Sequence, residues 1–240
     1  MKLVFEFVKT GNMIYISHLD MSRLFLRVFR MTGLRPAYSQ GFTPHPKLSF
    51  ALPLSLGIHS VCELLEFETD DISGAVKGIT SGVREEISKK VSETNGRLPE
   101  GMRIKAWYEK PGKITKTLAA LAMSATYEFM CNDIADAPEK LETFFKRDAV
   151  TAVKRDKKTN SDKEADIRSM MLGYRVTKHI RGRLLAEVTL AAAPSRTLNP
   201  RVFFSAFCQY SGIDEALLSP VITRTVILGA DGRALKEVLG

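Results

Sequence analysis

Three arginines near the start of the sequence have the spacing of a phosphate-binding helix face. Arg23, Arg27 and Arg30 recur at steps of four and three residues, so they would lie on one side of a helix. Each guanidinium can bond two phosphate oxygens at once, which favours phosphate as the ligand. An ordinary solvated helix face is the alternative interpretation.

A proline-rich segment that follows these arginines carries flat rings and a cation. Such rings stack on nucleobases while a cation holds phosphate, and the prolines and one glycine stiffen the backbone. The alternative is a packing loop whose tyrosine and phenylalanine lie in the core. The candidate ligand-binding residues of this segment are Tyr38, Ser39, Gln40, Gly41, Phe42, His45 and Lys47.

Two histidines are candidates for acid–base chemistry near neutral pH, His18 and His45. His18 lies between Ser17 and Asp20, which have the spacing of a helix cap and could also contact a ligand. Capping alone is the simpler interpretation of these three residues.

Asp166 and Arg168 flank one residue, so on a strand they would share a face. An ion pair within a sheet is one interpretation of this pair, and contact with a ligand is the other.

Metal ligands are not predicted in this chain. An iron–sulfur cluster needs closely spaced cysteines, but Cys62, Cys131 and Cys208 are far apart. His59 and Cys62 have a ligand-like spacing without a second pair, which a structural zinc site normally shows. Walker, Rossmann and nucleophile-elbow motifs are absent from the sequence.

The elements that position these residues follow one order twice, strand–helix–strand–strand–helix–strand. This order predicts an α+β protein with two tandem ferredoxin-like (split βαβ) domains and antiparallel sheets, each sheet exposing one face. We expect domains at 1–112 and 121–240 with a linker at 113–120. The predicted strands are 2–8, 47–56, 61–68, 102–108, 125–132, 150–154, 170–176, 184–191 and 221–228, with helices at 17–33, from 70 or 73 to 91, 137–147 and 199–210, and a polar connection at 155–163.

Composition limits the class of protein. The chain has 240 residues, 45% of them hydrophobic, and a net charge of +8, which excludes general disorder and favours anionic partners. Residues 1–59 hold seven basic and two acidic residues, and residues 146–183 hold twelve and five. Without a membrane-length apolar run or an export signal, and with an odd number of cysteines, a cytoplasmic protein is expected.

Several segments of the chain resemble one bacterial family of undefined function, the radical-SAM-linked proteins. They are Ile16-Ser-His-Leu-Asp20 with Arg23, Ala37 to Lys47, Leu48 to Gly57, and the acidic-Ile-Arg block that ends at Arg168. The resemblance implies a cytoplasmic bacterial protein whose partner is a radical SAM protein. Any iron–sulfur cluster and S-adenosylmethionine would then belong to that partner, with no cofactor in this chain.

These patterns lead us to expect an RNA-binding accessory protein for a radical SAM partner, with no catalytic activity alone and no membrane association. Transfer RNA or another structured RNA, in the course of its modification, is the expected ligand. One alternative is a metal-independent endoribonuclease resembling the CRISPR repeat-processing enzymes, which also pair two ferredoxin-like domains. Another is a non-enzymatic docking domain for the radical SAM protein.

Overall fold

The computed structural model describes residues 1–70, 79–132, 136–156, 161–180, 183–218 and 220–239, in a mixed α+β fold with antiparallel sheets. The chain forms two compact units. The first comprises Met1–Ala122 together with Gly229–Gly240, and the second comprises Met123–Leu228. Within the described ranges, no helix is both long and apolar enough to cross a membrane.

In the first unit, the sheet strands pair antiparallel in the order β2-β3-β1-β4. Among the described residues of this unit, two longer helices and three short ones connect or flank these strands. The elements of this unit are β1 (Lys2–Lys9), η1 (Gly11–Tyr15), α1 (His18–Met31), β2 (Leu48–Phe50), β3 (His59–Glu68), α2 (Ser81–Asn95), β4 (Met102–Glu109), α3 (Leu118–Leu121) and η3 (Leu235–Val238).

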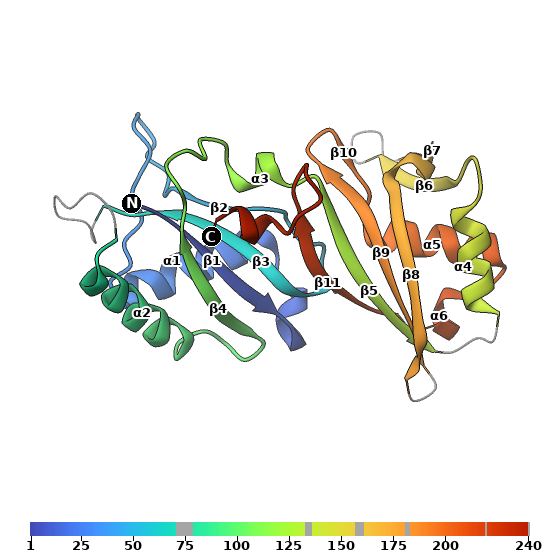
Figure 1. Ribbon diagram of the computed structural model, residues 1–240, viewed down its shortest axis with the longest axis horizontal. Helices are drawn as coiled ribbons and strands as arrows, with labels where there is room; N and C mark the ends of the chain where they lie inside the picture. The colour runs from blue at the N-terminus through green and yellow to red at the C-terminus, as the bar shows by residue number, and fades with distance from the viewer. Residues whose placement is uncertain (71–78, 133–135, 157–160, 181–182, 219, 240) are drawn as a thin grey trace. The chain divides into compact units, whose positions relative to one another are not determined.

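Helices α1 and α2 cover one face of this sheet (Figure 1). The core between them is aromatic: the ring of Phe7 on β1 meets Phe25 of α1 at 4.8 Å, and Phe5 meets Phe29 at 5.1 Å between centroids. This packing holds α1 by its apolar stripe and leaves the opposite side of the helix in solvent.

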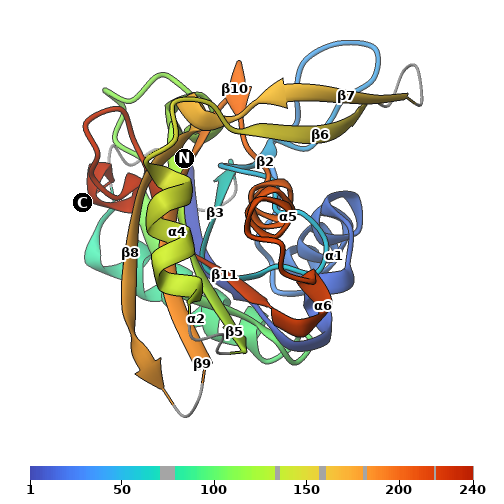
Figure 2. The same cartoon turned by 90° about the vertical axis from the view of Figure 1, so that its right-hand side faces the viewer.

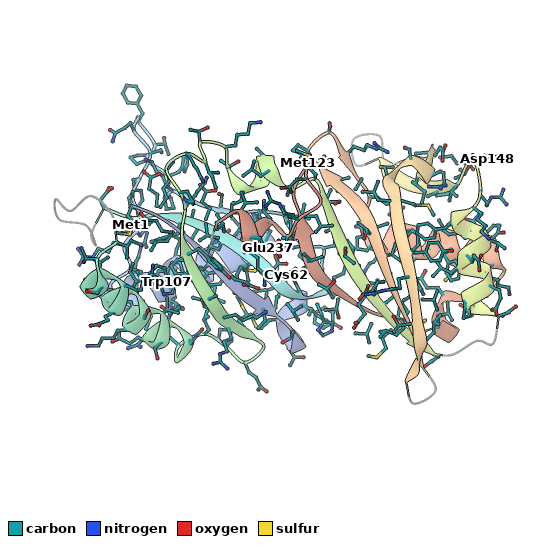
Figure 3. The ribbon with its side chains drawn as sticks, viewed as in Figure 1. Met1, Cys62, Trp107, Met123, Asp148 and Glu237 are labelled. Carbon is teal, nitrogen blue, oxygen red and sulfur yellow. The ribbon has the colours of Figure 1, made fainter. Side chains whose placement is uncertain are left out.

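The second face of the sheet is covered as well, in contrast to the open face expected from the sequence. Glu6 of β1 is 3% exposed, and its carboxylate accepts hydrogen bonds from Lys236 Nζ at 3.2 Å and from the Tyr108 hydroxyl at 2.9 Å. Lys236 belongs to the short C-terminal helix η3, whose residue Glu237 is labelled in Figure 3. This segment therefore closes over a sheet surface that would otherwise meet solvent.

Glu6 keeps its charge in this position. Burial opposes ionisation, but the hydrogen bonds from Tyr108 and Lys236 and the charge of Lys105 outweigh it and lower the pKa of Glu6. Burial and the same hydrogen bond raise the pKa of Tyr108 to about 12.

A buried ion pair fastens the segment that leads to α3. Lys110 Nζ lies 2.6 Å from Glu66 Oε1 and donates to the Lys116 carbonyl at 2.7 Å. The other oxygen of Glu66 accepts from the Leu118 backbone N–H at 3.0 Å. Each charge is thus met by several partners, as burial of an ion pair requires.

In the second unit, β11 pairs with β5, β5 with β9, and β9 with both β8 and β10, in each case antiparallel. Helices α4 and α5 lie side by side (Figure 2), and Phe144 of α4 meets Phe203 of α5 at 5.8 Å between ring centroids. Strands β6 and β7 form a separate hairpin. The elements are β5 (Ser124–Asn132), α4 (Ala137–Phe145), β6 (Thr151–Asp156), β7 (Ser161–Asp166), η2 (Arg168–Met170), β8 (Met171–Ile180), β9 (Arg183–Ala193), β10 (Arg196–Thr197), α5 (Pro200–Ser211), α6 (Glu215–Leu218) and β11 (Val221–Leu228).

Three predictions of secondary structure and one of a domain boundary differ from the structure. The strand expected at 47–56 is only β2, because its register with β3 ends at Phe50, opposite Leu65. Helix α2 begins at Ser81 behind a Thr80 cap, and residues 71–78 lie outside the described ranges. The polar run at 155–163 contains parts of β6 and β7, with 157–160 not described. Residues 229–240, placed with the second domain from sequence, group with the first unit.

Candidate nucleic-acid interface

Helix α1 begins where the sequence predicts, because Ser17 caps it. The Ser17 hydroxyl oxygen accepts from the Asp20 N–H at 3.1 Å and donates to Asp20 Oδ2 at 2.7 Å. This hydrogen bond, together with Arg23, lowers the pKa of Asp20. The predicted cap at Ser17 is confirmed, whereas the Asp20 carboxylate accepts from the Ser17 hydroxyl and from Arg23.

The three arginines are all exposed, on the side of α1 opposite the buried Met21, Phe25 and Phe29. Arg23 lies 3.1 Å from Asp20 Oδ1, which offsets part of its charge, although both side chains are more than half exposed. The structure therefore presents the predicted cationic face to solvent, with Arg27 at its middle.

Arg30 connects this face to the loop that follows. Its NH2 group donates a 2.8 Å hydrogen bond to the Tyr38 hydroxyl, across eight residues of sequence. Tyr38 stays 41% exposed, so the alternative that places it in the core is wrong.

The loop from Ser39 to His45 is closed at its base. The Ser39 N–H donates to the His45 carbonyl at 2.8 Å, and the His45 N–H donates to Ser39 Oγ at 2.9 Å. Directly below, Tyr38 and Pro46 form an antiparallel bridge. The seven residues between these contacts therefore project as one tied loop, which extends away from the sheet in Figure 1.

Phe42 lies in this loop with no packing at all. Its relative exposure is 110%, the highest among the large hydrophobic residues described as exposed. The preceding Gly41 has φ of +127°, a conformation that residues with a Cβ rarely adopt. The placement of Phe42 in the core is therefore wrong, and its ring is free for contact with a ligand. Gln40 is exposed beside it.

Lys47 has a partner that the sequence analysis missed. Its ammonium lies 2.9 Å from Glu68 Oε1 at the end of β3, and both side chains are partly exposed. Glu68 lies 21 residues further along the chain, and only the antiparallel pairing of β2 and β3 brings the two together. The ion pair offsets the charge of Lys47, so the arginines are the stronger candidates for phosphate contacts.

The two candidate general bases lie in different surroundings. The ring of His18 meets Phe50 edge-on at 4.9 Å between centroids, whereas His45 contributes backbone groups to the loop closure. In the part of the chain that the structure describes, neither imidazole has a hydrogen-bond or ion-pair partner. A catalytic base is normally oriented by such a partner, so the geometry supplies no argument for acid–base chemistry here.

Asp166 and Arg168 belong to the second unit and do not share a strand face. Asp166 ends β7 and accepts from the N–H groups of Arg168 at 2.9 Å and Val150 at 3.0 Å, which lowers its pKa. Arg168 begins η2, and its Nε donates to the Arg147 carbonyl at 2.8 Å. The expected ion pair within a sheet is wrong, because the chain leaves the strand between the two residues.

Sequence reasoning also missed two exposed apolar residues, one in η1 and one in the first turn of α1. Tyr15 in η1 is 68% exposed and Leu19 in the first turn of α1 is 58% exposed. An isolated tyrosine or leucine gives no signal in a sequence pattern. Over the described ranges, no three His, Cys, Asp or Glu side chains lie close enough together to hold a metal ion.

The fold and this surface define an α+β protein with an exposed cationic helix and a tied aromatic loop, a class compatible with several functions. The chain belongs to a protein family conserved in bacteria and uncharacterized in function (DUF2344), whose sequence pattern matches residues 2–200. The match takes in the whole arginine face, the loop and most of the second unit. No curated protein matches the chain.

Proposed function

We propose that this protein binds RNA through the arginine face of α1 and the loop from Ser39 to His45. Arg23, Arg27 and Arg30 contact phosphates, and Phe42 stacks on a base. The observation that carries this proposal is the fully exposed Phe42 ring, on a loop that the Arg30–Tyr38 hydrogen bond ties to the arginine face.

Energetics support a binding role for Phe42. Burying a phenylalanine side chain stabilises a protein by about 1.5–3 kcal/mol, and this residue forgoes that gain. Stacking of one base on an aromatic ring contributes about 1–3 kcal/mol, a gain of similar size. Because Ser39 and His45 already close the loop, little ordering of the backbone would oppose binding.

The strand orders support two ferredoxin-like domains. The first unit runs β4-β1-β3-β2 and the second runs β11-β5-β9-β8, each with antiparallel neighbours. RNA-binding modules of this kind commonly use an open sheet face. In the first unit, Tyr108 and Lys236 cover Glu6 on that face, which favours α1 and the loop from Ser39 to His45 as the contact surface.

We further propose that the RNA is a transfer RNA or another structured RNA, and that a cytoplasmic radical SAM protein acts on it. This part rests on the family resemblance alone. Co-purification of the two proteins tests it, and nuclease treatment should release the partner if RNA connects them. Retention of the partner without RNA would instead favour the docking alternative.

A salt titration tests RNA binding. The probe is a fluorescently labelled transfer RNA, and the readout is anisotropy between 50 and 200 mM salt. Three phosphate contacts predict a loss of affinity of about 20- to 40-fold over this range. Absence of binding at 50 mM salt, or binding without dependence on salt, would overturn the proposal.

Charge-matched variants assign the contacts to α1. Arg27→Gln should weaken binding and reduce the slope of log affinity against log salt by about 1. Arg103→Gln removes an equal charge from an exposed position on β4 and serves as the control. Equal effects of the two substitutions would show that net charge, and not the arginine face, attracts the RNA.

A further inference from the structure

The second unit contains a cavity that the proposed RNA interface does not use. It lies where the β6–β7 hairpin approaches β10 and the first turn of α5, and its volume is about 350 Å³. Small-molecule sites generally have volumes of 300–1,000 Å³, so this cavity has the size of a small metabolite site.

A pair of alanines creates the space. Ala152 on β6 and Ala165 on β7 lie directly opposite each other across the hairpin, and both line the cavity. Larger side chains at this cross-strand position would fill it. Ile167 and Leu198, both nearly buried, add an apolar surface. The interior therefore suits a hydrocarbon or aromatic group.

One positive charge stands among the lining residues. Arg196 is the charged member of the lining, and its NH2 group donates to the backbone carbonyl of Ser169. Among the residues that the structure describes, no carboxylate pairs with this guanidinium. The neighbouring Ser195 and Thr197 add hydroxyl groups to the same lining. The polar side of the cavity therefore carries the positive charge of Arg196. The Ser169 carbonyl orients this guanidinium, and no carboxylate among the described residues neutralises it.

We propose that this cavity binds a small organic carboxylate, with its apolar body against the alanine pair and its carboxylate on Arg196. A single guanidinium balances one negative charge, and its planar fork matches the two oxygens of a carboxylate. The volume of about 350 Å³ accommodates about twelve non-hydrogen atoms at about 30 Å³ for each. Octanoate and phenylacetate have this size and serve as probes.

Isothermal titration calorimetry with octanoate tests the charge requirement. Octanoate should bind in a saturable manner at one site, and the uncharged octanol should bind at least about 10-fold more weakly. Arg196→Gln should weaken octanoate by about 10- to 100-fold. Arg201→Gln removes the same charge from the exposed surface of α5, outside the lining, and should leave binding unchanged.

A second variant tests the location. Ala165→Leu places a larger side chain in the cavity and should abolish octanoate binding, while far-ultraviolet circular dichroism remains that of the unchanged protein. Absence of saturable binding of both probes would overturn the proposal. The proposal would also be overturned if octanol bound as tightly as octanoate. Unchanged octanoate binding to Arg196→Gln, or to a folded Ala165→Leu, would overturn it as well.

Discussion

Replacing Phe42 by alanine separates an effect on binding from an effect on stability. The side chain is 110% exposed, so its loss removes no buried surface and leaves no cavity. The free energy of unfolding should therefore stay within about 0.5 kcal/mol of its original value. Loss of one stacked base should cost RNA binding about 1–3 kcal/mol, a decrease of about 5- to 150-fold in affinity.

Fluorescence anisotropy and thermal unfolding of the same preparations measure the two quantities. Phe42→Trp keeps a flat ring and should bind RNA at least as well as the unchanged protein. Phe42→Leu keeps the apolar character without the π-face, and should bind about as poorly as Phe42→Ala if stacking is the contact.

Three results would refute this reasoning. Unchanged RNA affinity in Phe42→Ala would remove the ring from the interface. A marked loss of stability would mean that the ring is packed in solution, contrary to its exposure in the structure. An unchanged RNA affinity of Phe42→Leu would indicate that the side chain inserts into an apolar pocket, as expected for a protein partner, and does not stack on a base.

Other contacts give predictions that need no ligand or only the same RNA assay. Tyr38→Phe removes the hydroxyl that accepts from Arg30, and it should weaken RNA binding by about 2- to 10-fold without loss of stability. Anisotropy and thermal unfolding measure the two quantities. An unaffected RNA affinity would count against the role of the Arg30–Tyr38 hydrogen bond in binding. Gly101→Ala should destabilise the first unit by about 2 kcal/mol or more in urea unfolding, because the added Cβ would lie 2.3 Å from the Thr10 carbonyl oxygen at a φ of +89°; an unchanged midpoint would contradict this. Since the folded pKa of Glu6 is lowered, its ionised form stabilises the fold above the ordinary value of 4.5, and that contribution is lost as pH falls through the folded pKa. The difference in unfolding free energy between the unchanged protein and Glu6→Gln should accordingly shrink below about pH 4.5, and a constant difference would refute the assignment.

The sequence predicts α1 well because its determinants are local. Ser17 and Asp20 form the cap within four residues, and Gly33 follows the helix with a positive φ of 73°. The apolar stripe that faces the sheet repeats every three or four residues, so the exposed side of the helix follows from the same pattern.

The rest of the site depends on contacts between distant residues. The ion pair of Lys47 with Glu68 requires β2 to pair with β3, and the covering of Glu6 requires Lys236, 230 residues further on. No local pattern contains such pairs. Strand β7 escaped prediction for another reason, because Ser161–Asp166 is rich in charged residues and lacks apolar alternation, whereas β6 lies where a strand was predicted at 150–154.

The membership of residues 229–240 in the first unit has a consequence for biosynthesis. A ribosome releases every residue of the second unit before it releases Lys236, the residue that reaches back to Glu6. During translation, the Glu6 carboxylate therefore lacks its contact with Lys236 until the second unit has been synthesised. The second unit can fold during this time. Completion of the two units is therefore expected in an order opposite to their order of emergence.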